Sequence, residues 1–202
     1  MTSWAELLTG TVPGEHVVQL YGEDDQLLTR NVSRYLAEGL RRGDGLVVIA
    51  TPEHTSALAR HLGDEEPRLA REATSPGRVV YLDARETLAR LLEAGRLDER
   101  RFRAMIGEVL RTVRAGSASG TVRAFGEMVS LLWDDGREED AARLEAMWNT
   151  ILSEHECSLF CAYRIDLFGQ PDDAASLHPI VCSHDYLLAG SGTLLSSGRA
   201  RA

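Results

Sequence analysis

Short apolar runs rich in β-branched residues alternate with longer segments of helical periodicity along most of this chain. A strand buried on both faces reads as a continuous apolar run. By this criterion we expect five strands, over His16–Tyr21, Gly45–Thr51, Arg78–Asp83, Thr121–Gly126 and Cys157–Tyr163. Strands separated by helices imply right-handed crossover connections. The pattern therefore predicts a three-layer α/β fold around a mainly parallel five-stranded sheet.

Apolar residues at helical spacing fill the intervals between these strands. We expect helices over Leu27–Arg42, Pro52–Leu62, Ala84–Glu93, Asp98–Arg114, Glu127–Trp133, Glu138–His155 and Asp172–His184, the last with Pro179 against it. Gly63–Gly77 is expected to be a loop with a short helical turn. Residues 1–14 would be an N-terminal extension, 15–189 one domain, and 190–202 a flexible, frayed tail.

The composition restricts the partners that we expect. The 202 residues include 22 basic and 31 acidic ones, for a formal net charge of −9. Non-specific nucleic-acid binding needs clustered cations, so we expect no direct contact with nucleic acid. No apolar stretch approaches the ~20 residues that span a bilayer, and no signal peptide is recognisable. With only three cysteines, the chain is expected to be cytoplasmic, without membrane contact or a disulfide framework.

Ligands of open α/β sheets bind beyond the carboxyl ends of the strands. The first such loop, Gly22–Gln26, has one glycine, no lysine and three acids. A phosphate-binding loop needs several glycines followed by Lys and Ser or Thr, and three carboxylates would repel a triphosphate. The loop therefore argues against a nucleotide hydrolase. Its acids could also be solvated groups that favour the positive N-terminus of the next helix.

Two charged residues mark the fourth strand. Arg123 lies inside its apolar run, and Glu127 follows Gly126 at its carboxyl end. An arginine within a buried strand must find an anion or a carboxylate. Arg123 and Glu127 could line a polar pocket, or Arg123 could form an internal salt bridge with Glu145 or Asp166. The sequence leaves both interpretations open.

Aromatic, histidine and cysteine residues offer further candidates. Trp148 and Tyr163 could line a ligand pocket, although the position of Trp148 four residues after Leu144 is typical of a core face. His16 and His54 could each reach the crevice, or serve as surface or capping residues. Four residues offer the ligand types of a zinc site, namely Cys157, Cys161, Cys182 and His184. Against zinc, buried cysteine usually behaves as a small hydrophobe.

Several short motifs between about Glu15 and Asp185 follow one another in a characteristic order. The first half contributes His16–Tyr21 with its acidic loop, Gly39-Leu40, Gly43-Asp44 and Val47–Ala50. The second half contributes Arg123–Met128, Leu132-Trp133, Leu144-Glu145, Trp148-Asn149, Leu159–Tyr163 and Val181–His184. In this order they resemble the MEDS family, the methanogen/methylotroph DcmR sensory domain.

The resemblance implies a sensory input domain of bacterial and archaeal signalling proteins. It implies a RecA/KaiC-like core that has lost the phosphate loop and that senses small molecules such as hydrocarbon derivatives. The family supplies no catalytic residues to carry over. Because no output module is recognisable in the sequence, we expect a separate signalling partner or a longer parent protein.

We therefore expect a non-enzymatic sensory or regulatory domain without a cofactor. Its partners would be a small-molecule ligand and a kinase, anti-sigma factor or transcription factor, with a homodimer as a further option. The expected ligand-binding residues are His16, Tyr21, Glu23, Arg123, Glu127, Trp148 and Tyr163. The alternatives are a nucleotide-binding RecA/KaiC-like protein and a metal- or redox-responsive regulator that uses Cys157, Cys161, Cys182 and His184.

Overall fold

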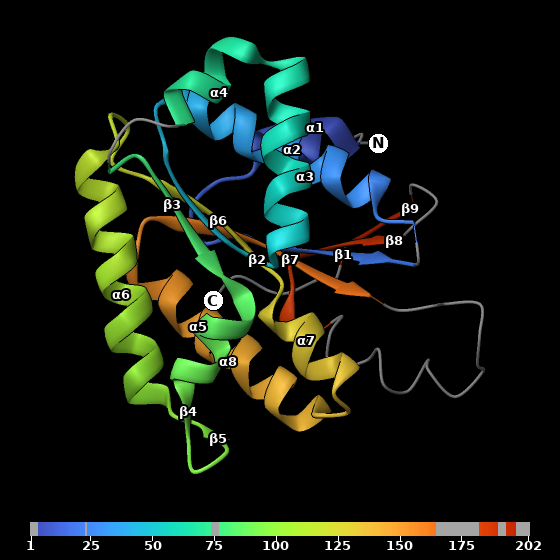
Figure 1. Ribbon diagram of the computed structural model, residues 1–202, viewed down its shortest axis with the longest axis vertical. Helices are drawn as coiled ribbons and strands as arrows, with labels where there is room; N and C mark the ends of the chain where they lie inside the picture. The colour runs from blue at the N-terminus through green and yellow to red at the C-terminus, as the bar shows by residue number, and fades with distance from the viewer. Residues whose placement is uncertain (1–3, 23, 74–76, 165–181, 190–192, 197–202) are drawn as a thin grey trace.

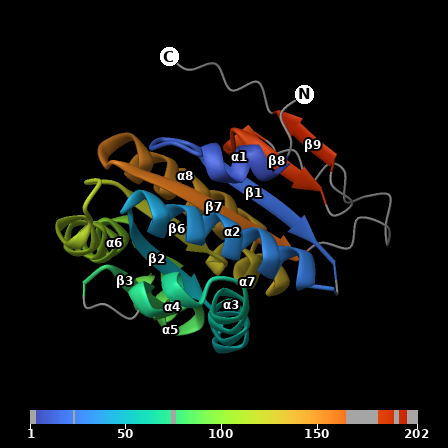
Figure 2. The same cartoon turned by 90° about the horizontal axis from the view of Figure 1, so that it is seen from above.

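A central sheet carries helices on both faces (Figure 1, Figure 2) in the computed structural model, which describes residues 4–22, 24–73, 77–164, 182–189 and 193–196. Its strands are β1 (His16–Tyr21), β2 (Gly45–Ala50), β3 (Val79–Asp83), β6 (Val122–Gly126), β7 (Cys157–Arg164), β8 (Tyr186–Ala189) and β9 (Thr193–Ser196). Their order is β3-β2-β6-β7-β1-β8-β9, and within this sheet of described strands only the pair β8 and β9 is antiparallel. The predicted three-layer, mainly parallel α/β architecture is confirmed.

The five predicted strands are all present, each within one residue of its expected ends. The sheet of the described residues has seven strands instead of five, because β8 adds to β1 and β9 folds back on β8. The expectation of a frayed tail is wrong for Thr193–Ser196, which forms β9. Both added strands have four residues, which is too short to show a periodic pattern of their own.

The helices divide between the two faces of the sheet. They are α1 (Trp4–Gly10), α2 (Gln26–Arg42), α3 (Pro52–Glu65), α4 (Pro67–Ala73), α5 (Ala84–Leu91), α6 (Glu99–Gly116), α7 (Met128–Asp134) and α8 (Glu138–Glu154). Helices α1–α4 contribute to one hydrophobic core and α5–α8 to the other. Val17 and Val18 of β1 belong to opposite cores, as the alternation of side chains along a strand requires.

Several elements depart from the sequence-based expectations. The extension expected at residues 1–14 contains α1, and the loop expected at 63–77 contains α4. Helix α5 stops at Leu91, because a two-stranded hairpin of β4 (Leu92–Glu93) and β5 (Arg96–Leu97) follows it. For the helix expected over Asp172–His184, positions 172–181 lie outside the described residues. None of the described helices is long and apolar enough to cross a membrane.

Candidate functional site

Polar side chains gather at the edge where β1, β2 and β6 end. These strands run parallel, so their carboxyl ends meet at one edge; Ile49 of β2 lies beside Gly126 of β6. Glu127 follows β6 directly and is 2% exposed. The backbone amide of Thr51, which follows β2, donates a hydrogen bond to the Glu127 carboxylate. The Glu127 carboxylate therefore binds the backbone amide of the residue that caps α3.

His54 connects two carboxylates at this edge. Thr51 caps α3 by accepting a hydrogen bond from the backbone amide of His54, which sets the histidine in the first turn. The imidazole Nδ1 contacts Glu127 Oε2, and Nε2 lies 3.1 Å from Asp25 Oδ2. The ring of Tyr21 packs edge-on against this imidazole, with 6.1 Å between centroids. Residues that follow three different strands thus form one acid–histidine–acid chain.

The charges at this edge favour a protonated histidine. The hydrogen bond that His54 donates to Glu127 raises the pKa of His54 above its usual value; burial opposes this effect, and Asp25 adds to it. Burial, with the nearby Glu127 charge, raises the pKa of Tyr21 to about 12. With His54 protonated, Asp25, Glu127 and the imidazolium together carry one net negative charge.

The loop after β1 has no cation for a phosphate group. Asp24 accepts a hydrogen bond of 2.9 Å from the backbone amide of Gln26, and Asp25 contacts His54. Glu23, expected to bind ligand, lies outside the described residues. The 202-residue sequence contains no lysine at all, so each of its 22 basic residues is an arginine. The Lys that reaches the phosphates in a phosphate-binding loop is therefore missing from the sequence.

A second polar cluster lies between the sheet and α8. His16 of β1, Cys161 of β7, Glu145 of α8 and His184, just before β8, are each at most 1% exposed. Their potential ligand atoms all lie within 4.8 Å of one another. Burial opposes ionisation of Glu145, but His184 and His16 outweigh it and lower the pKa of this carboxyl to about 2. Burial and Glu145 raise the pKa of the Cys161 thiol well above its usual value.

Two aromatic residues expected to bind ligand lie inside the protein. Tyr163 donates a hydrogen bond of 2.8 Å to Glu145 Oε1 and is 1% exposed. Trp148, also 1% exposed, packs edge-on against Phe102 with 5.2 Å between ring centroids. Trp148 thus occupies the core face that its spacing from Leu144 indicates, and Tyr163 belongs to the cluster around Glu145.

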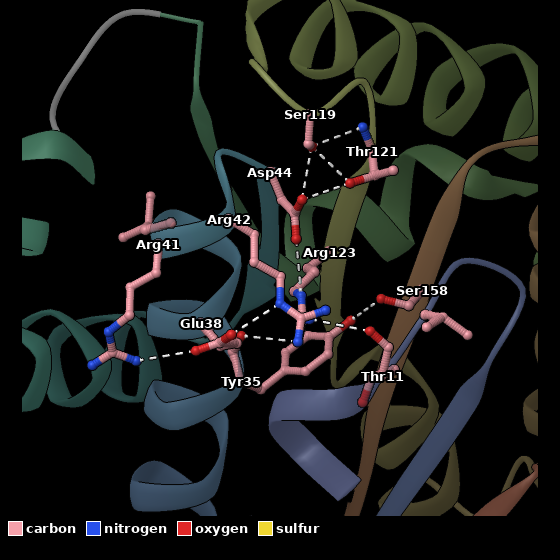
Figure 3. A network of polar contacts seen from close by, with 12 residues as sticks. Thr11, Tyr35, Glu38, Arg41, Arg42, Asp44, Ser119, Thr121, Arg123 and Ser158 are labelled. Carbon is pink, nitrogen blue, oxygen red and sulfur yellow. Dashed lines mark hydrogen bonds and ion pairs between the residues drawn. The ribbon is translucent and has the colours of Figure 1, made fainter. Parts of the chain in front are cut away.

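Arg123 does not share a pocket with Glu127, and that expectation is wrong. Figure 3 shows its guanidinium among Asp44, Tyr35 and Thr11, on the side of the sheet covered by α1 and α2. Nε donates to Asp44 Oδ2 over 3.1 Å, and the terminal nitrogens donate to the carbonyl groups of Leu8, Thr9, Thr11 and Tyr35. The internal salt bridge exists, but its partner is Asp44 and not Glu145; Asp166 lies outside the described residues.

The cysteines expected as metal ligands do not come together. Cys161 and His184 belong to the buried cluster, whereas Cys182 is exposed. Cys157 is buried at the start of β7, and its thiol donates to the carbonyl of Ser158 over 3.3 Å. Within the described ranges, the expected set of four is therefore wrong, and His16 and Glu145 take the places of Cys157 and Cys182.

Sequence reasoning located part of the carboxyl edge and missed the rest. Tyr21 and Glu127 lie at strand ends, as expected, and His54, one of two histidines that the sequence allows to reach the crevice, lies at this edge as well. The sequence marks Asp25 only as one of three acids in the first loop. The Thr51-Pro52 helix start is a sequence signal that places His54 in the first turn of a helix, whereas its contact with Asp25 is known only from the structure. His16 lies in the buried cluster, beside Cys161 and Glu145.

Comparisons with known proteins agree with this fold. A family model described as the methanogen/methylotroph, DcmR sensory domain (MEDS) matches residues 15–184. No curated protein matches the sequence. Among solved structures, a KaiC-like protein from the hyperthermophilic archaeon Pyrococcus horikoshii OT3 is similar, with a TM-score of 0.57 and 12% sequence identity. The match covers 88% of this chain and 71% of that chain, and it confirms the predicted KaiC-like fold class.

Proposed function

We propose, from the premise that this chain belongs to the family of methanogen/methylotroph DcmR sensory domains, that it binds a small molecule at the carboxyl ends of β1, β2 and β6 without converting it. The family itself indicates a sensory or regulatory role. The observation that carries the proposed site is the buried carboxylate of Glu127, which the Thr51 amide and His54 hold at the end of β6. A polar group this well positioned at a strand end is the usual anchor of a ligand in such sheets.

The charge of the site selects the class of ligand. Asp25 and Glu127 both contact His54, Asp24 lies in the same loop as Asp25, and Arg164 at the end of β7 is itself paired with Asp134 over 3.8 Å. An anionic ligand would be repelled there, whereas a hydrogen-bond donor or a cation would find two carboxylates. We therefore expect an uncharged or cationic small molecule that donates hydrogen bonds. The alternative of a triphosphate ligand is disfavoured by the same charges and by the lack of lysine.

The contacts of His54 favour recognition over catalysis. Both of its ring nitrogens contact carboxylates, and no hydroxyl or thiol hydrogen-bonds to the ring among the described residues. Nucleophilic catalysis needs such a group next to the base. These contacts support the proposal that the domain recognises its ligand without converting it.

The same contacts suggest how binding reaches a partner. Asp25 precedes α2, His54 begins α3 and Glu127 precedes α7. A ligand that replaces His54 on Glu127 would favour one arrangement of these three helix starts over another, and a signal requires such a difference in affinity. We propose that a signalling protein, such as a kinase, an anti-sigma factor or a transcription factor, reads this difference.

A ligand screen tests the proposal. The melting temperature of the full chain is measured against a panel of neutral, cationic and anionic metabolites, with Glu127→Gln beside the wild type. We expect at least one neutral or cationic compound to stabilise the wild type and not Glu127→Gln. Glu108→Gln, at an exposed position of α6, is the control and should respond like the wild type. A panel that stabilises neither protein, or equal stabilisation of both by every hit, contradicts the proposed site.

A further inference from the structure

The buried cluster below β1 and β7 is separate from the carboxyl edge and has a different chemistry. It consists of two imidazoles, one thiol and one carboxylate, from His16, His184, Cys161 and Glu145. We infer that these four residues bind one Zn²⁺ ion in a closed, structural site. The inference does not depend on the ligand proposed above, because the two sites share no residue.

The spacing of the four side chains fits a tetrahedral shell. His16 Nε2 lies 3.1 Å from Cys161 Sγ and 3.4 Å from Glu145 Oε2, and His184 Nε2 lies 3.3 Å from Glu145 Oε1. Cys161 Sγ and Glu145 Oε2 are 3.9 Å apart. Zinc bonds of about 2.0–2.3 Å at tetrahedral angles place neighbouring ligand atoms roughly 3.3–3.7 Å apart. The four separations of 3.1–3.9 Å lie close to this range, and one ligand atom from each residue fits within 4.8 Å of all the others.

Neighbouring side chains orient the proposed ligands. Asn149 donates through Nδ2 to the carbonyl of Ser183 over 3.0 Å, so its Oδ1 is the atom that lies 3.0 Å from His16 Nδ1. The oxygen accepts, which puts the His16 proton on Nδ1 and directs the Nε2 lone pair at the cluster. Tyr163 donates to Glu145 Oε1. Such outer hydrogen bonds accompany metal-binding histidines and carboxylates as a rule.

Charge gives an independent reason for a divalent ion. All four residues are at most 1% exposed, so a charge there has little water around it. A carboxylate and a thiolate together carry two negative charges, which Zn²⁺ neutralises. On binding, the Cys161 S–H proton leaves to solvent and the sulfur bonds to the ion. Two imidazoles, a thiolate and a carboxylate are the ligand types that zinc prefers, and four protein ligands leave no open position for a substrate.

The position of the cluster suggests what the ion would do. His184 lies two residues before the start of β8, while the other three proposed ligands belong to β1, β7 and α8. Two hydrogen bonds of 2.8 Å already join Asp185 to His16. The backbone amide of Asp185 donates to the carbonyl of His16, and the backbone amide of His16 donates to the Asp185 carboxylate. Zinc bound here would fix the segment that carries β8 to the centre of the sheet.

Metal titration of the full chain tests the inference. Protein stripped with a chelator is titrated with Zn²⁺ and Co²⁺, and the bound metal is counted by mass spectrometry. We expect one ion per chain, with the visible absorption of tetrahedral Co²⁺ and a thiolate-to-cobalt charge-transfer band. Cys161→Ser should abolish that band, and Cys161→Ser and His184→Gln should each weaken binding at least about tenfold. Far-UV circular dichroism establishes that each variant is folded.

The remaining cysteines supply matched controls. Cys157→Ser removes an equally buried thiol of the same strand, and Cys182→Ser removes an exposed one. Both variants should keep the charge-transfer band and the affinity of the wild type. Substoichiometric metal in the wild type, a cobalt spectrum without thiolate character, or unchanged binding by folded Cys161→Ser and His184→Gln would overturn the inference in favour of a metal-free hydrogen-bonded cluster.

Discussion

Arg123 Nε lies 3.1 Å from Asp44 Oδ2 in the interior of the protein, with side-chain exposures of 3% and 7%. The second oxygen of Asp44 accepts hydrogen bonds from Ser119 and Thr121, and the guanidinium lies 4.9 Å from the ring centroid of Tyr35 (Figure 3). Because the arginine also binds carbonyl groups at residues 8, 9 and 11, the pair connects α1 to the sheet. Arg123 is therefore a structural residue.

Replacing this arginine should destabilise the fold strongly. Arg123→Met keeps most of the volume but leaves the buried Asp44 without its cation, a change that costs about 3–5 kcal/mol. Urea denaturation should show this decrease in the free energy of unfolding. We also expect faster proteolysis within α1. Arg111→Met, at an exposed ion pair with Glu108, should stay within about 0.5 kcal/mol of the wild type. A loss equally small for Arg123→Met would contradict the structural role.

The contribution of His54 to stability should depend on pH. Glu127, Asp25 and the ring of Tyr21 surround the imidazole, and the Glu127 hydrogen bond raises the pKa of His54 above 6.5. The folded protein then binds this proton more tightly than the unfolded chain, so the stabilisation is complete below pH 6.5 and is lost as the pH rises through the folded-state pKa. Urea denaturation of the wild type and His54→Asn across this range measures the difference. In the Glu127→Gln background the dependence should flatten, and an unchanged slope would argue against the pairing.

Two glycines should respond in opposite directions to alanine. A Cβ at Gly45 would lie 2.4 Å from Val113 Cγ1 and 2.7 Å from the Val113 carbonyl oxygen. Gly45→Ala should therefore cost about 1–3 kcal/mol through overpacking of β2 against α6. At Gly63, within α3, a Cβ would meet no atom within 4 Å. Gly63→Ala should stabilise by about 0.5–1 kcal/mol. Thermal denaturation of both variants checks the signs, and equal effects would count against the close contact of β2 with α6.

The orienting role of Asn149 predicts an effect on metal affinity. Asn149→Ala removes the acceptor from His16 Nδ1, and loss of such a partner typically lowers metal affinity about 10–100-fold. A competition titration with a chromophoric chelator measures the change. Thr150→Ala, on the same helix, removes a hydroxyl that bonds only to the Ala146 carbonyl among the described residues and should leave the affinity unaltered. Equal metal affinities of the two variants would contradict the role of Asn149 in orienting His16.

The strands were predictable because a strand buried on both faces is a continuous run of apolar residues in the sequence. Gly45–Ala50 is apolar throughout, and all six residues are buried. The partner of Arg123 was not predictable from such local patterns, since Asp44 is 79 residues away in the chain. Glu145, one expected partner, lies on α8 across the sheet, whereas Arg123 points toward α1 and α2. The choice between Asp44 and Glu145 depends on which face of the sheet each helix covers, and local sequence patterns do not give that.

The candidate sites likewise include one part that is predictable from local sequence and one that depends on the tertiary fold. Glu127 follows an apolar strand, so its place at the carboxyl edge was predictable from residues 122–127 alone. The buried cluster joins positions 16, 145, 161 and 184, and no spacing in the sequence groups them. Their proximity arises from the parallel pairing of β1 with β7, which places Val18 beside Cys161, and from the packing of α8 beneath both strands.

Calorimetric titration of the full chain with MgATP tests most directly whether this KaiC-like fold recognises a small molecule other than a nucleotide. The site has three acids in the first loop and no lysine in the sequence, so we predict only heats of dilution for the wild type. Saturable binding of MgATP at micromolar concentration, lost in Glu127→Gln, would contradict the proposed function.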